Sequence, residues 1–288
     1  MIPMTPLISI ITVSLNAAAT IEDTIASVSM QSTDFQFEHI CVDGGSTDGS
    51  REIIDRWMAK SNIIRKIYES DVGIADAMNK GLRTAKGEYV LFLNADDFLV
   101  EQSTLAKAMQ GVILGGPNNP DLIAGDVCMG RLDRRGVWRH RRVPRLLLYL
   151  KESGLFPVHQ GLFSRRRLLQ ECGGFKTELL SSADVILFYD LEREFHPSVR
   201  LLRTDIAYMR AGGYANSSMK MMYLGTVDMY RHLSRQYGVV KAAAMVVIKT
   251  MQSFTELRYG SCPRQRWFIV SSIGAQISAL ETTKARKA

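Results

Sequence analysis

Two adjacent carboxylates, Asp96 and Asp97, follow a run of strand-forming apolar residues in the segment YVLFLNADDFL, residues 89–99. Neighbouring carboxylates repel each other, and each loses solvation near a protein core. A positive group between or beside them would relieve both costs. The pair therefore predicts a site for a divalent cation, and a strand-end turn capped by aspartate is the alternative interpretation.

The first hundred residues alternate between strand and helix patterns. Strands are expected over residues 7–14, 37–42, 62–70 and 88–94, and helices over residues 20–31, 46–60 and 72–87. Gly87 is expected to be the C′ residue that ends the third helix. This βαβαβαβ order predicts an α/β fold with a mostly parallel, Rossmann-like sheet that carries helices on both faces.

Acidic residues follow three of these strands. Asp43 comes after the second strand, Asp71 after the third, and Asp96 with Asp97 after the fourth. Ligands of such sheets bind beyond the carboxyl ends of the strands, so the acids predict a site at that edge. The sequence has no GxGxxG after the first strand and no GxxxxGK[ST] motif. Phosphates bound here would therefore need a metal ion in place of a glycine-rich loop.

Length and composition fit one large domain, or one domain plus an appendage, because the chain has 288 residues, of which 46% are hydrophobic. The four cysteines are far apart and form no CxxC pair, which indicates a reducing compartment. The N-terminal MIPMTPLISIITVS has no basic segment, and its apolar run is too short for a signal peptide or a membrane span. We therefore expect a cytoplasmic protein.

The excess positive charge lies in the C-terminal part of the sequence. Residues 219–288 carry 11 Lys and Arg against 3 Asp and Glu, whereas the remainder is about neutral. An apolar stripe at helical spacing is formed by Val240, Ala243, Val247, Met251 and Phe254, and Trp267 and Phe268 stand among arginines. The pattern resembles a membrane-surface element, and a helix packed on its own domain is the open alternative. Nucleic acid is not an expected partner, because no reading module is recognisable.

A second basic segment, RLDRRGVWRHRRVPR, covers residues 131–145 with seven arginines and one aspartate. Its alternating centre predicts a hairpin strand with an exposed basic face. Such a face could contact a lipid diphosphate acceptor or anionic headgroups. A solvated sheet edge protected by charge is the alternative.

Five segments in order resemble the family 2 glycosyltransferases with the GT-A fold. They are SIITVSLN, VDGGSTDGS, ESDVGIADAMNKGLRTAKGEYVLFLNADD, HQGLFSRRRLLQECGGF and SSADVILFYDL. The resemblance covers about residues 5–210 and is strongest to the bacterial group that builds capsule, O-antigen and exopolysaccharide. It implies a GT-A domain over residues 1–215, with a basic, amphipathic helical extension over residues 216–288.

The resemblance also implies a role for each matching acid. Asp43 would accept a ring N–H of the nucleobase, with a turn or helix cap as the alternative. Asp97 would be the direct ligand of Mg or Mn on the donor diphosphate, and Asp96 would contact the ribose or a metal-bound water. Asp184 would be the general base of the inverting reaction, with the N-cap of its helix as the alternative. Asp190 lies about 240° further round that helix, so the two acids cannot share a face.

Other matches to the family are weaker. Residues implied on the donor side are Ser14, Asn16, Asp71 and Lys80, with Asp76 and Asn79 nearby. Lys80 could approach the diphosphate, although a solvated helix face explains it nearly as well. Leu15 stands where many relatives have an aromatic residue, which argues against base stacking there. His159 and Gln160 match an HQ pair near the acceptor, and a hydrogen-bonded structural histidine is the open alternative.

The implied reaction transfers a sugar, with inversion, from a nucleotide-sugar donor to a glycan or lipid-linked acceptor in surface polysaccharide biosynthesis. A UDP-sugar is the first choice of donor, and the expected location is the cytoplasmic face of a membrane. A nucleotidyltransferase is one alternative, but it typically has a basic glycine-rich loop after the first strand. A catalytically inactive sugar-nucleotide-binding scaffold is the other, and intact Asp96, Asp97 and Asp184 count against it.

Overall fold

The computed structural model describes residues 5–114, 119–130, 139–141, 158–179, 182–210, 219–255 and 258–259. Most of the arginine-rich segment 131–145 lies outside these ranges, as do Trp267 and Phe268. Met251 and Phe254 lie within a described helix, but their side chains are outside the description.

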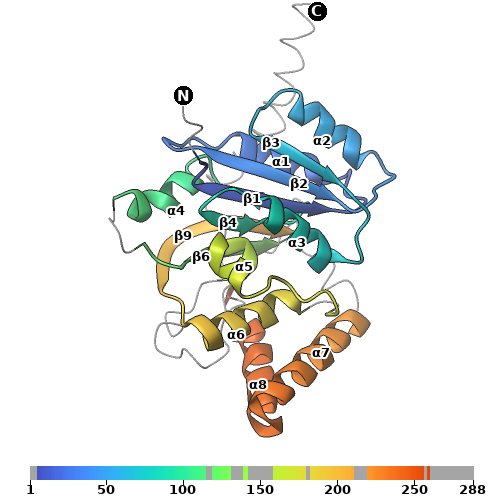
Figure 1. Ribbon diagram of the computed structural model, residues 1–288, viewed down its shortest axis with the longest axis vertical. Coiled ribbons are helices and arrows are strands. Elements are labelled where there is room, and N and C mark those ends of the chain that lie inside the picture. The colour runs from blue at the N-terminus through green and yellow to red at the C-terminus, as the bar shows by residue number, and fades with distance from the viewer. Residues whose placement is uncertain are drawn as a thin grey trace, which may run out of the picture.

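The N-terminal half forms the predicted alternation of strands and helices (Figure 1). Its elements are β1 (Ile8–Ser14), α1 (Ile21–Ser29), β2 (Phe37–Asp43), α2 (Ser50–Met58), β3 (Ile64–Tyr68), α3 (Ile74–Thr84) and β4 (Tyr89–Phe92). The strands are parallel and lie in the order β4-β1-β2-β3. The predicted α/β class is therefore confirmed.

Strand β1 is buried along its whole length because helices cover both faces of the sheet. Successive side chains of a strand point to opposite faces. Accordingly, Ile8 and Ile10 pack in one core cluster with α4 (Thr104–Ile113), and Ile11 and Val13 pack in another with α3 and α6 (Ala183–Phe195). This two-sided burial accounts for a strand sequence with no charged residue, in which the buried Ser9 and Thr12 hydroxyls find hydrogen-bond partners in Glu38 and His39.

The C-terminal half extends the sheet with mostly antiparallel pairs. Its elements are β5 (Phe98–Leu99), β6 (Leu122–Gly130), β7 (Arg139–Arg141), the 3₁₀ turn η2 (His159–Gly161), β8 (Leu162–Arg165), α5 (Arg166–Glu171) and β9 (Val199–Arg210). β8 joins β4 to β6, and β9 pairs in parallel with β6 and antiparallel with β5. β7 confirms a strand within the arginine-rich segment, next to β6.

Gly87 does not have its predicted role. Helix α3 already ends at Thr84, and the residue after it, Ala85, is extended. Gly87 instead lies directly against β1, where an added Cβ would come within 2.4 Å of the backbone nitrogen of Ser9. Glycine is needed here because two backbones approach closely, and the prediction of a helix C′ residue is wrong.

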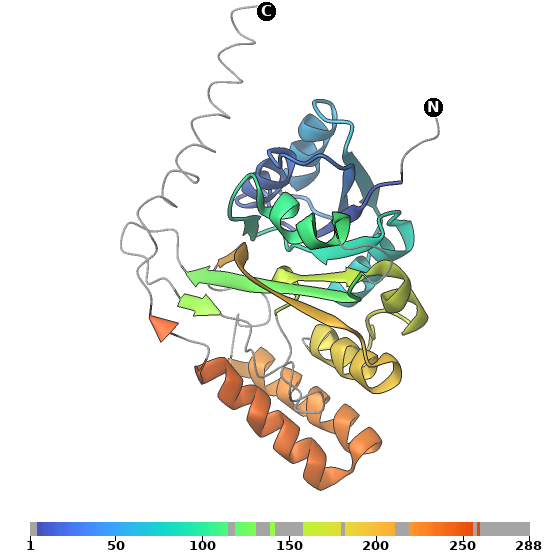
Figure 2. The ribbon, with the colours of Figure 1, turned by 90° about the vertical axis from the view of Figure 1, so that its left-hand side faces the viewer.

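The C-terminal extension forms a pair of helices at the end of the molecule opposite α2 (Figures 1 and 2). Its elements are α7 (Met219–Tyr237), α8 (Val239–Thr255) and the short strand β10 (Arg258–Tyr259). Ile186 and Tyr189 of α6 share an apolar cluster with residues of both helices. No helix in the described ranges has both the length and the apolar character needed to cross a membrane.

Buried polar contacts also hold the extension in place. Asp190 accepts hydrogen bonds from Lys176 (2.6 Å) and from Gln236 of α7 (3.1 Å), and His232 lies beside them. Burial alone would raise the pKa of Asp190, but these hydrogen bonds and the Lys176 charge outweigh it and lower the pKa. Asp190 is therefore a structural acid that fastens α7 to α6.

Candidate active site

The sheet reverses its direction of growth between β1 and β4. From β1 the chain adds β2 and then β3 on one side, and it returns to place β4 on the other side of β1. The loops that leave β1 and β4 diverge at such a point and leave a crevice at the carboxyl ends of the strands. Asn16 lies just after β1, and Asp96 and Asp97 lie just after β4, so the fold places both groups at this crevice.

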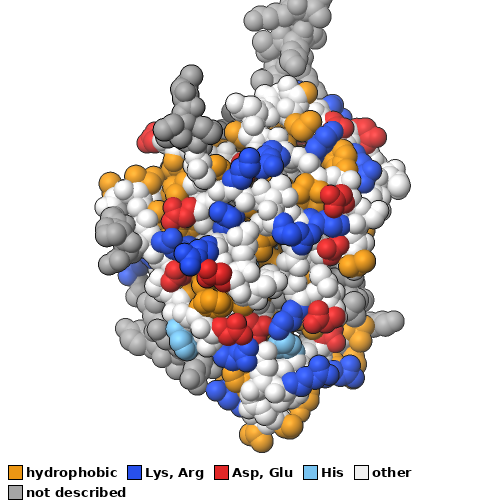
Figure 3. Space-filling model, in the orientation of Figure 1, with side chains coloured by type: hydrophobic (Ala, Val, Ile, Leu, Met, Phe, Trp, Pro, Cys, Tyr) orange, Lys and Arg blue, Asp and Glu red, His pale blue; other side chains and the backbone are white. Residues whose placement is uncertain are grey.

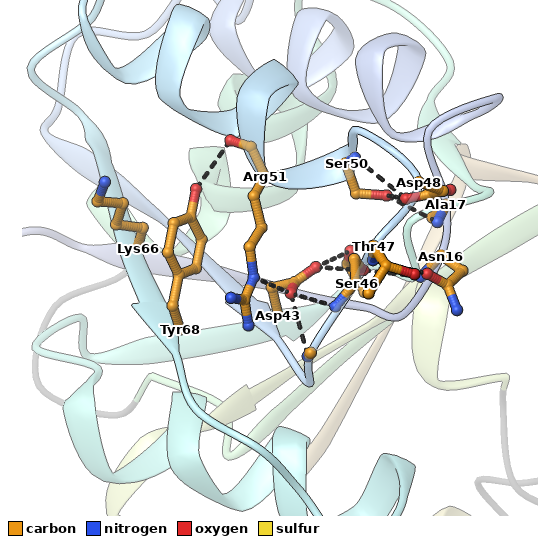
Figure 4. A network of polar contacts seen from close by, with 12 residues as sticks. Asn16, Ala17, Asp43, Ser46, Thr47, Asp48, Ser50, Arg51, Lys66 and Tyr68 are labelled. Carbon is orange, nitrogen blue, oxygen red and sulfur yellow. Dashed lines mark hydrogen bonds and ion pairs between the residues drawn. The ribbon is translucent and has the colours of Figure 1, made fainter.

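Asp43, at the end of β2, is fully buried and receives five hydrogen bonds (Figure 4). The donors are the Ser14 hydroxyl (3.0 Å), the Ser46 hydroxyl (2.6 Å), the backbone nitrogens of Gly45 (3.1 Å) and Ser46 (2.9 Å), and Arg51 Nε (2.7 Å). Burial alone would raise the pKa of Asp43, but these bonds outweigh it and hold the pKa below its usual range. Donors within the protein thus satisfy the hydrogen-bonding capacity of the Asp43 carboxylate without a ligand.

This arrangement bears directly on the nucleobase contact that the sequence predicts for Asp43. The carboxylate has no exposed surface, and a turn anchored by an aspartate is what it forms here. A base N–H could reach it only if one of the present donors withdrew. Arg51 is the donor best able to do so, because its side chain is about one-third exposed.

The loops after β1 and β2 are joined into one unit (Figure 4). The backbone nitrogen of Asn16 donates to the Ser46 hydroxyl (2.7 Å), and the side-chain Oδ1 of Asn16 accepts from the backbone nitrogen of Thr47 (3.0 Å). Asn16 adopts a positive φ of 51°, which asparagine tolerates better than most residues. Leu15 is 60% exposed and offers no aromatic surface beside this unit.

Asp71 lies at the same edge, whereas Lys80 is held slightly away from it. An added Cβ on Gly44 would come within 1.9 Å of the Asp71 carboxylate, so Asp71 packs directly against the backbone beside Asp43. Lys80 donates to the carbonyl of Ser70 and pairs with Asp76 at 3.2 Å. The structure therefore brings Asp71 to the candidate site and uses Lys80 to hold the loop that carries it.

Asn79 does not belong to the site. Its side chain exchanges two hydrogen bonds with the backbone of Phe175, which fixes α3 against the segment that follows α5.

Asp97 is 2% exposed, yet it has few partners in the described structure. Its carboxylate accepts one hydrogen bond from Gln160 Nε2 (2.9 Å) and one from the backbone nitrogen of Arg210 (3.1 Å). Burial and then the charge of Asp96 raise the pKa of Asp97 to about 7. Burial raises the pKa of Asp96 as well, although the charges of Arg210 and His159 oppose it.

The surroundings of the two acids fit a hard cation. Besides the carboxylates, the amide oxygens of Asn94 and Gln160 are buried and have no hydrogen-bond partner among the described residues. Such oxygen atoms are the ligands that Mg²⁺ and Mn²⁺ prefer. Among the residues that the structure describes, no three His, Cys, Asp or Glu side chains lie close enough together to bind one metal ion. A bound ion would therefore need further ligands from water or substrate.

Asp184 lies in the first turn of α6, where the helix dipole favours a negative charge. The N-cap position belongs to Ser182, so the alternative reading of Asp184 as the N-cap is wrong. One carboxylate oxygen accepts from the nitrogen of Val185 (2.8 Å), and the other contacts His159 Nδ1 at 2.9 Å. Since an ionised carboxylate only accepts hydrogen bonds, His159 is the donor in this contact.

His159 and Gln160 are adjacent in η2, and each holds one acid. His159 contacts Asp184, and Gln160 contacts Asp97. This turn therefore links the candidate base to the candidate metal ligand. The sequence prediction placed the pair on the acceptor side, and the described contacts place it between the two carboxylates.

Sequence reasoning missed three residues that shape the site: Arg51, Tyr68 and Arg210. The Arg51 guanidinium lies over the Tyr68 ring at 4.9 Å while its Nε donates to Asp43. A basic residue in the first turn of a helix is disfavoured by the dipole, and this could have signalled a buried acid near Arg51. Arg210 ends β9 and pairs with Asp23 of α1, and no sequence pattern points to its place beside Asp97.

Comparison with known sequences agrees with this architecture. Residues 9–172 match the profile of the family described as Glycosyl transferase family 2. A PGL/p-HBAD biosynthesis glycosyltransferase of Mycobacterium tuberculosis is 31% identical over 241 residues, which is 82% of this chain and 89% of the relative. The putative teichuronic acid biosynthesis glycosyltransferase TuaG of Bacillus subtilis is 46% identical over 93 residues, which is 32% of this chain and 36% of that protein.

Solved structures share the fold. S. aureus TarS 1-349 in complex with UDP-GlcNAc superposes with a TM-score of 0.59 at 21% identity, over 86% of this chain and 72% of TarS. The mannosyltransferase PcManGT of Pyrobaculum calidifontis, in complex with GDP-Man and Mn²⁺, superposes with a TM-score of 0.54 at 19% identity. The match covers 96% of this chain and 81% of PcManGT. The predicted GT-A fold is confirmed. Because the family profile spans more than half of the sequence and the mycobacterial relative matches most of it, the chain belongs to glycosyltransferase family 2.

Proposed function

We propose that the chain is an inverting, metal-dependent glycosyltransferase that uses a nucleotide-sugar donor. The observation that carries the proposal is the pair Asp96 and Asp97, of which Asp96 is half-buried and Asp97 fully buried, with raised pKa values and few hydrogen-bond donors among the described residues. A folded protein keeps such a pair when a ligand supplies the missing positive charge. The diphosphate of a nucleotide sugar brings a divalent cation for this purpose.

UDP-sugars are the first choice of donor. TarS has been crystallised with UDP-GlcNAc and with UDP, and PcManGT with GDP-Man and Mn²⁺. These ligands support the nucleotide-sugar class for this chain, with UDP ahead of GDP. The nucleotide would lie over the joined loops of β1 and β2, and the donor-side residues would be Ser14, Asn16, Asp43, Asp71, Lys80 and Asp96.

Asp97 would be the direct protein ligand of Mg²⁺ or Mn²⁺, with Asp96 beside it. When bound, the ion stabilises the negative charge that develops on the leaving diphosphate. Gln160 and the backbone nitrogen of Arg210 fix the orientation of the Asp97 carboxylate, because each donates to one of its oxygens. The Asp97 side chain is thereby kept in an orientation that can bind the ion and does not rotate toward solvent.

Asp184 would take the proton from the acceptor hydroxyl as that oxygen attacks the anomeric carbon from the side opposite the diphosphate. Its carboxylate is about one-quarter exposed and so remains open to an incoming acceptor. The hydrogen bond from His159 would fix the angle of the carboxylate. No covalent intermediate is needed, and the anomeric configuration inverts.

The acceptor would be a glycan or a lipid-linked molecule in surface polysaccharide biosynthesis. Relatives named for PGL/p-HBAD and for teichuronic acid biosynthesis support this class. We assign the transfer reaction to a domain over residues 1–215 and keep residues 216–288 as an accessory helical part. A cytoplasmic location, with peripheral attachment to the inner face of the membrane, follows from an acceptor of this kind.

A thermal-shift screen of UDP-, GDP- and dTDP-sugars, each with and without Mn²⁺, tests the donor proposal, because a ligand of the native state raises the melting temperature. We expect a shift with one nucleotide class that depends on the metal. The variant Asp184→Asn should keep this shift and lose turnover by roughly 10² to 10⁴. No metal-dependent shift with any donor would overturn the proposal, and a shift without any transfer activity would favour an inactive binding scaffold.

A further inference from the structure

Helix α8 is apolar around its whole circumference in the part whose side chains are described. The sequence from residue 239 to residue 248 reads VVKAAAMVVI, in which Lys241 is the only charged residue. A helix of this character is normally buried on all sides, whereas a surface helix shows one polar face.

The structure buries only one side of α8. Ala242 and Met245 are 0% and 4% exposed, because they pack in the apolar cluster shared with α6 and α7. Val240 and Val247 point the other way and are 85% and 56% exposed. Ala243 and Ala244 are exposed between them. We call the surface formed by these four residues the outer face of α8.

This outer face is the stripe that the sequence singled out, continued in sequence by Met251 and Phe254. Figure 3 shows hydrophobic side chains gathered at the end of the molecule formed by α7 and α8, with Lys and Arg side chains beside them. Single exposed apolar residues are ordinary, but an aligned row of them on a helix marks a surface that contacts another apolar phase.

Exposed basic residues lie on both helices of the extension. Lys241 is exposed on α8, and Arg231 and Arg235 are exposed on α7. Two residues after α8 the chain enters β10, which pairs with the arginine-containing strand β7 (Figure 2). The sheet edge next to the end of α8 is therefore built from basic segments, because β10 contains Arg258 and β7 contains Arg139 and Arg141.

We propose that the outer face of α8 docks on an anionic lipid bilayer, with the helix lying in the plane of the interface. Apolar side chains would enter the boundary between headgroups and acyl chains, and the basic residues beside them would contact lipid phosphates. A second copy of this chain is a poorer occupant, because it would bring the same positive charge to the contact.

The proposal is independent of the sugar chemistry, since none of these residues belongs to the candidate active site. It adds an attachment surface to the fold. If the acceptor is lipid-linked, this surface would keep the crevice close to it, but the docking itself needs neither donor nor acceptor.

Sedimentation with vesicles of phosphatidylcholine, with and without phosphatidylglycerol, tests the proposal on the full chain. We expect binding to the anionic vesicles that weakens in high salt, because charge contributes to it. The double variant Val240→Asp with Val247→Asp should bind at least about tenfold more weakly. The matched control is Ile113→Asp with Leu114→Asp, which changes two comparably exposed apolar residues on α4 (55% and 77% exposed).

The control should bind vesicles as the unmodified chain does, and both double variants should keep the unmodified melting temperature. Equal binding by the α8 variant, equal loss in the α4 control, or failure of the unmodified chain to bind would overturn the proposal. Light scattering gives a second readout: a dimer that the α8 variant dissociates would assign the outer face to a second copy instead. Thermal shifts induced by the nucleotide-sugar donor are measured in parallel on the same variants. They test the donor proposal alone, so failure of one proposal can be told from failure of the other.

Discussion

Two buried carboxylates at the same edge of the sheet differ in how the protein treats them. Asp43 follows β2 and receives five hydrogen bonds, one of them from an arginine, which hold its pKa below the usual range. Asp97 follows β4 and receives two hydrogen bonds on its carboxylate from the described residues, with a second acid beside it, and its pKa is raised to about 7. The solvent-exposed fraction of the two residues is nearly the same, at 0% for Asp43 and 2% for Asp97.

The difference separates a structural acid from a ligand-binding acid. A carboxylate that the protein satisfies on its own stabilises the native fold when it is ionised. A carboxylate with few donors and an acidic neighbour costs free energy when it is ionised, and a bound cation removes that cost. The same residue type, after equivalent strands, thus serves opposite purposes, and substitutions at the two positions should have opposite effects on stability.

The largest expected effect is at Asp97. In Asp97→Asn the direct metal ligand is lost, so turnover should fall by at least about 10³, because metal stabilisation of leaving-group charge contributes several kcal/mol. The metal-free variant should nevertheless be more stable, on the order of 2 kcal/mol at pH 8, because a buried charge is removed. A transfer assay with donor and Mn²⁺ measures the turnover, and urea unfolding of the metal-free protein measures the stability.

The Asp97→Asn substitution need not leave an unpaired donor beside Gln160. The Gln160 side-chain amide can rotate by 180° and accept a hydrogen bond from the new Asn amide group. A variant that is inactive and destabilised would show that Asp97 is a structural acid like Asp43. Donor binding that is the same with and without Mn²⁺ in the unmodified chain would remove the metal role altogether.

The second test makes the same change at Asp43. Asp43→Asn leaves Arg51 without its charged partner and weakens five hydrogen bonds, so we expect a loss of stability of about 2 to 3 kcal/mol. The exposed Asp48 is a matched control in the same loop, where it accepts from the backbone nitrogens of Ala18 and Ser50. Asp48→Asn should cost clearly less stability than Asp43→Asn, because Asp48 is exposed to solvent. Equal losses in urea unfolding would contradict the distinction drawn for Asp43.

A smaller effect is expected at His159, which positions Asp184. His159→Ala removes the 2.9 Å contact, and kcat should fall by about 10 to 10² with an unchanged KM for the donor, since only the angle of the base is lost. Asn can place an amide N–H near the position of Nδ1, so His159→Asn should recover most of the activity. Failure of His159→Asn to exceed His159→Ala would assign His159 a packing role.

The sequence predicts the parts of this site that depend on local pattern. The run that becomes β4 and the acids after it are contiguous, and so are Asp43 and the loop residues that donate to it. The partners of Asp97 are not local, since Gln160 is 63 residues away and Arg210 is 113 residues away. Their positions depend on the mixed pairing of β8 and β9, which no period in the sequence reveals.

The C-terminal extension shows a second limit. The stripe at Val240, Ala243 and Val247 has the spacing of a buried face, yet the structure buries Ala242 and Met245 on the opposite side. A helix that is apolar all round gives no preference in the sequence, so tertiary packing on α6 decides which side is covered.

The smallest expected effect is on the pH dependence of the metal-free protein. Asp97 has an unfolded-state pKa near 4 and a folded-state pKa of about 7, so the unfolded chain loses its proton first as the pH rises. The contribution of Asp97 to the free energy of unfolding is therefore fully present below about pH 4 and decreases toward higher pH, by on the order of 1 kcal/mol between pH 6 and 8. The decrease should be missing in Asp97→Asn. It should also disappear when saturating Mn²⁺ and donor are present, because the metal binds the ionised carboxylate. If the decrease persists in Asp97→Asn, the proton belongs to Asp96, and the contrast with Asp43 applies to the pair instead of to Asp97 alone.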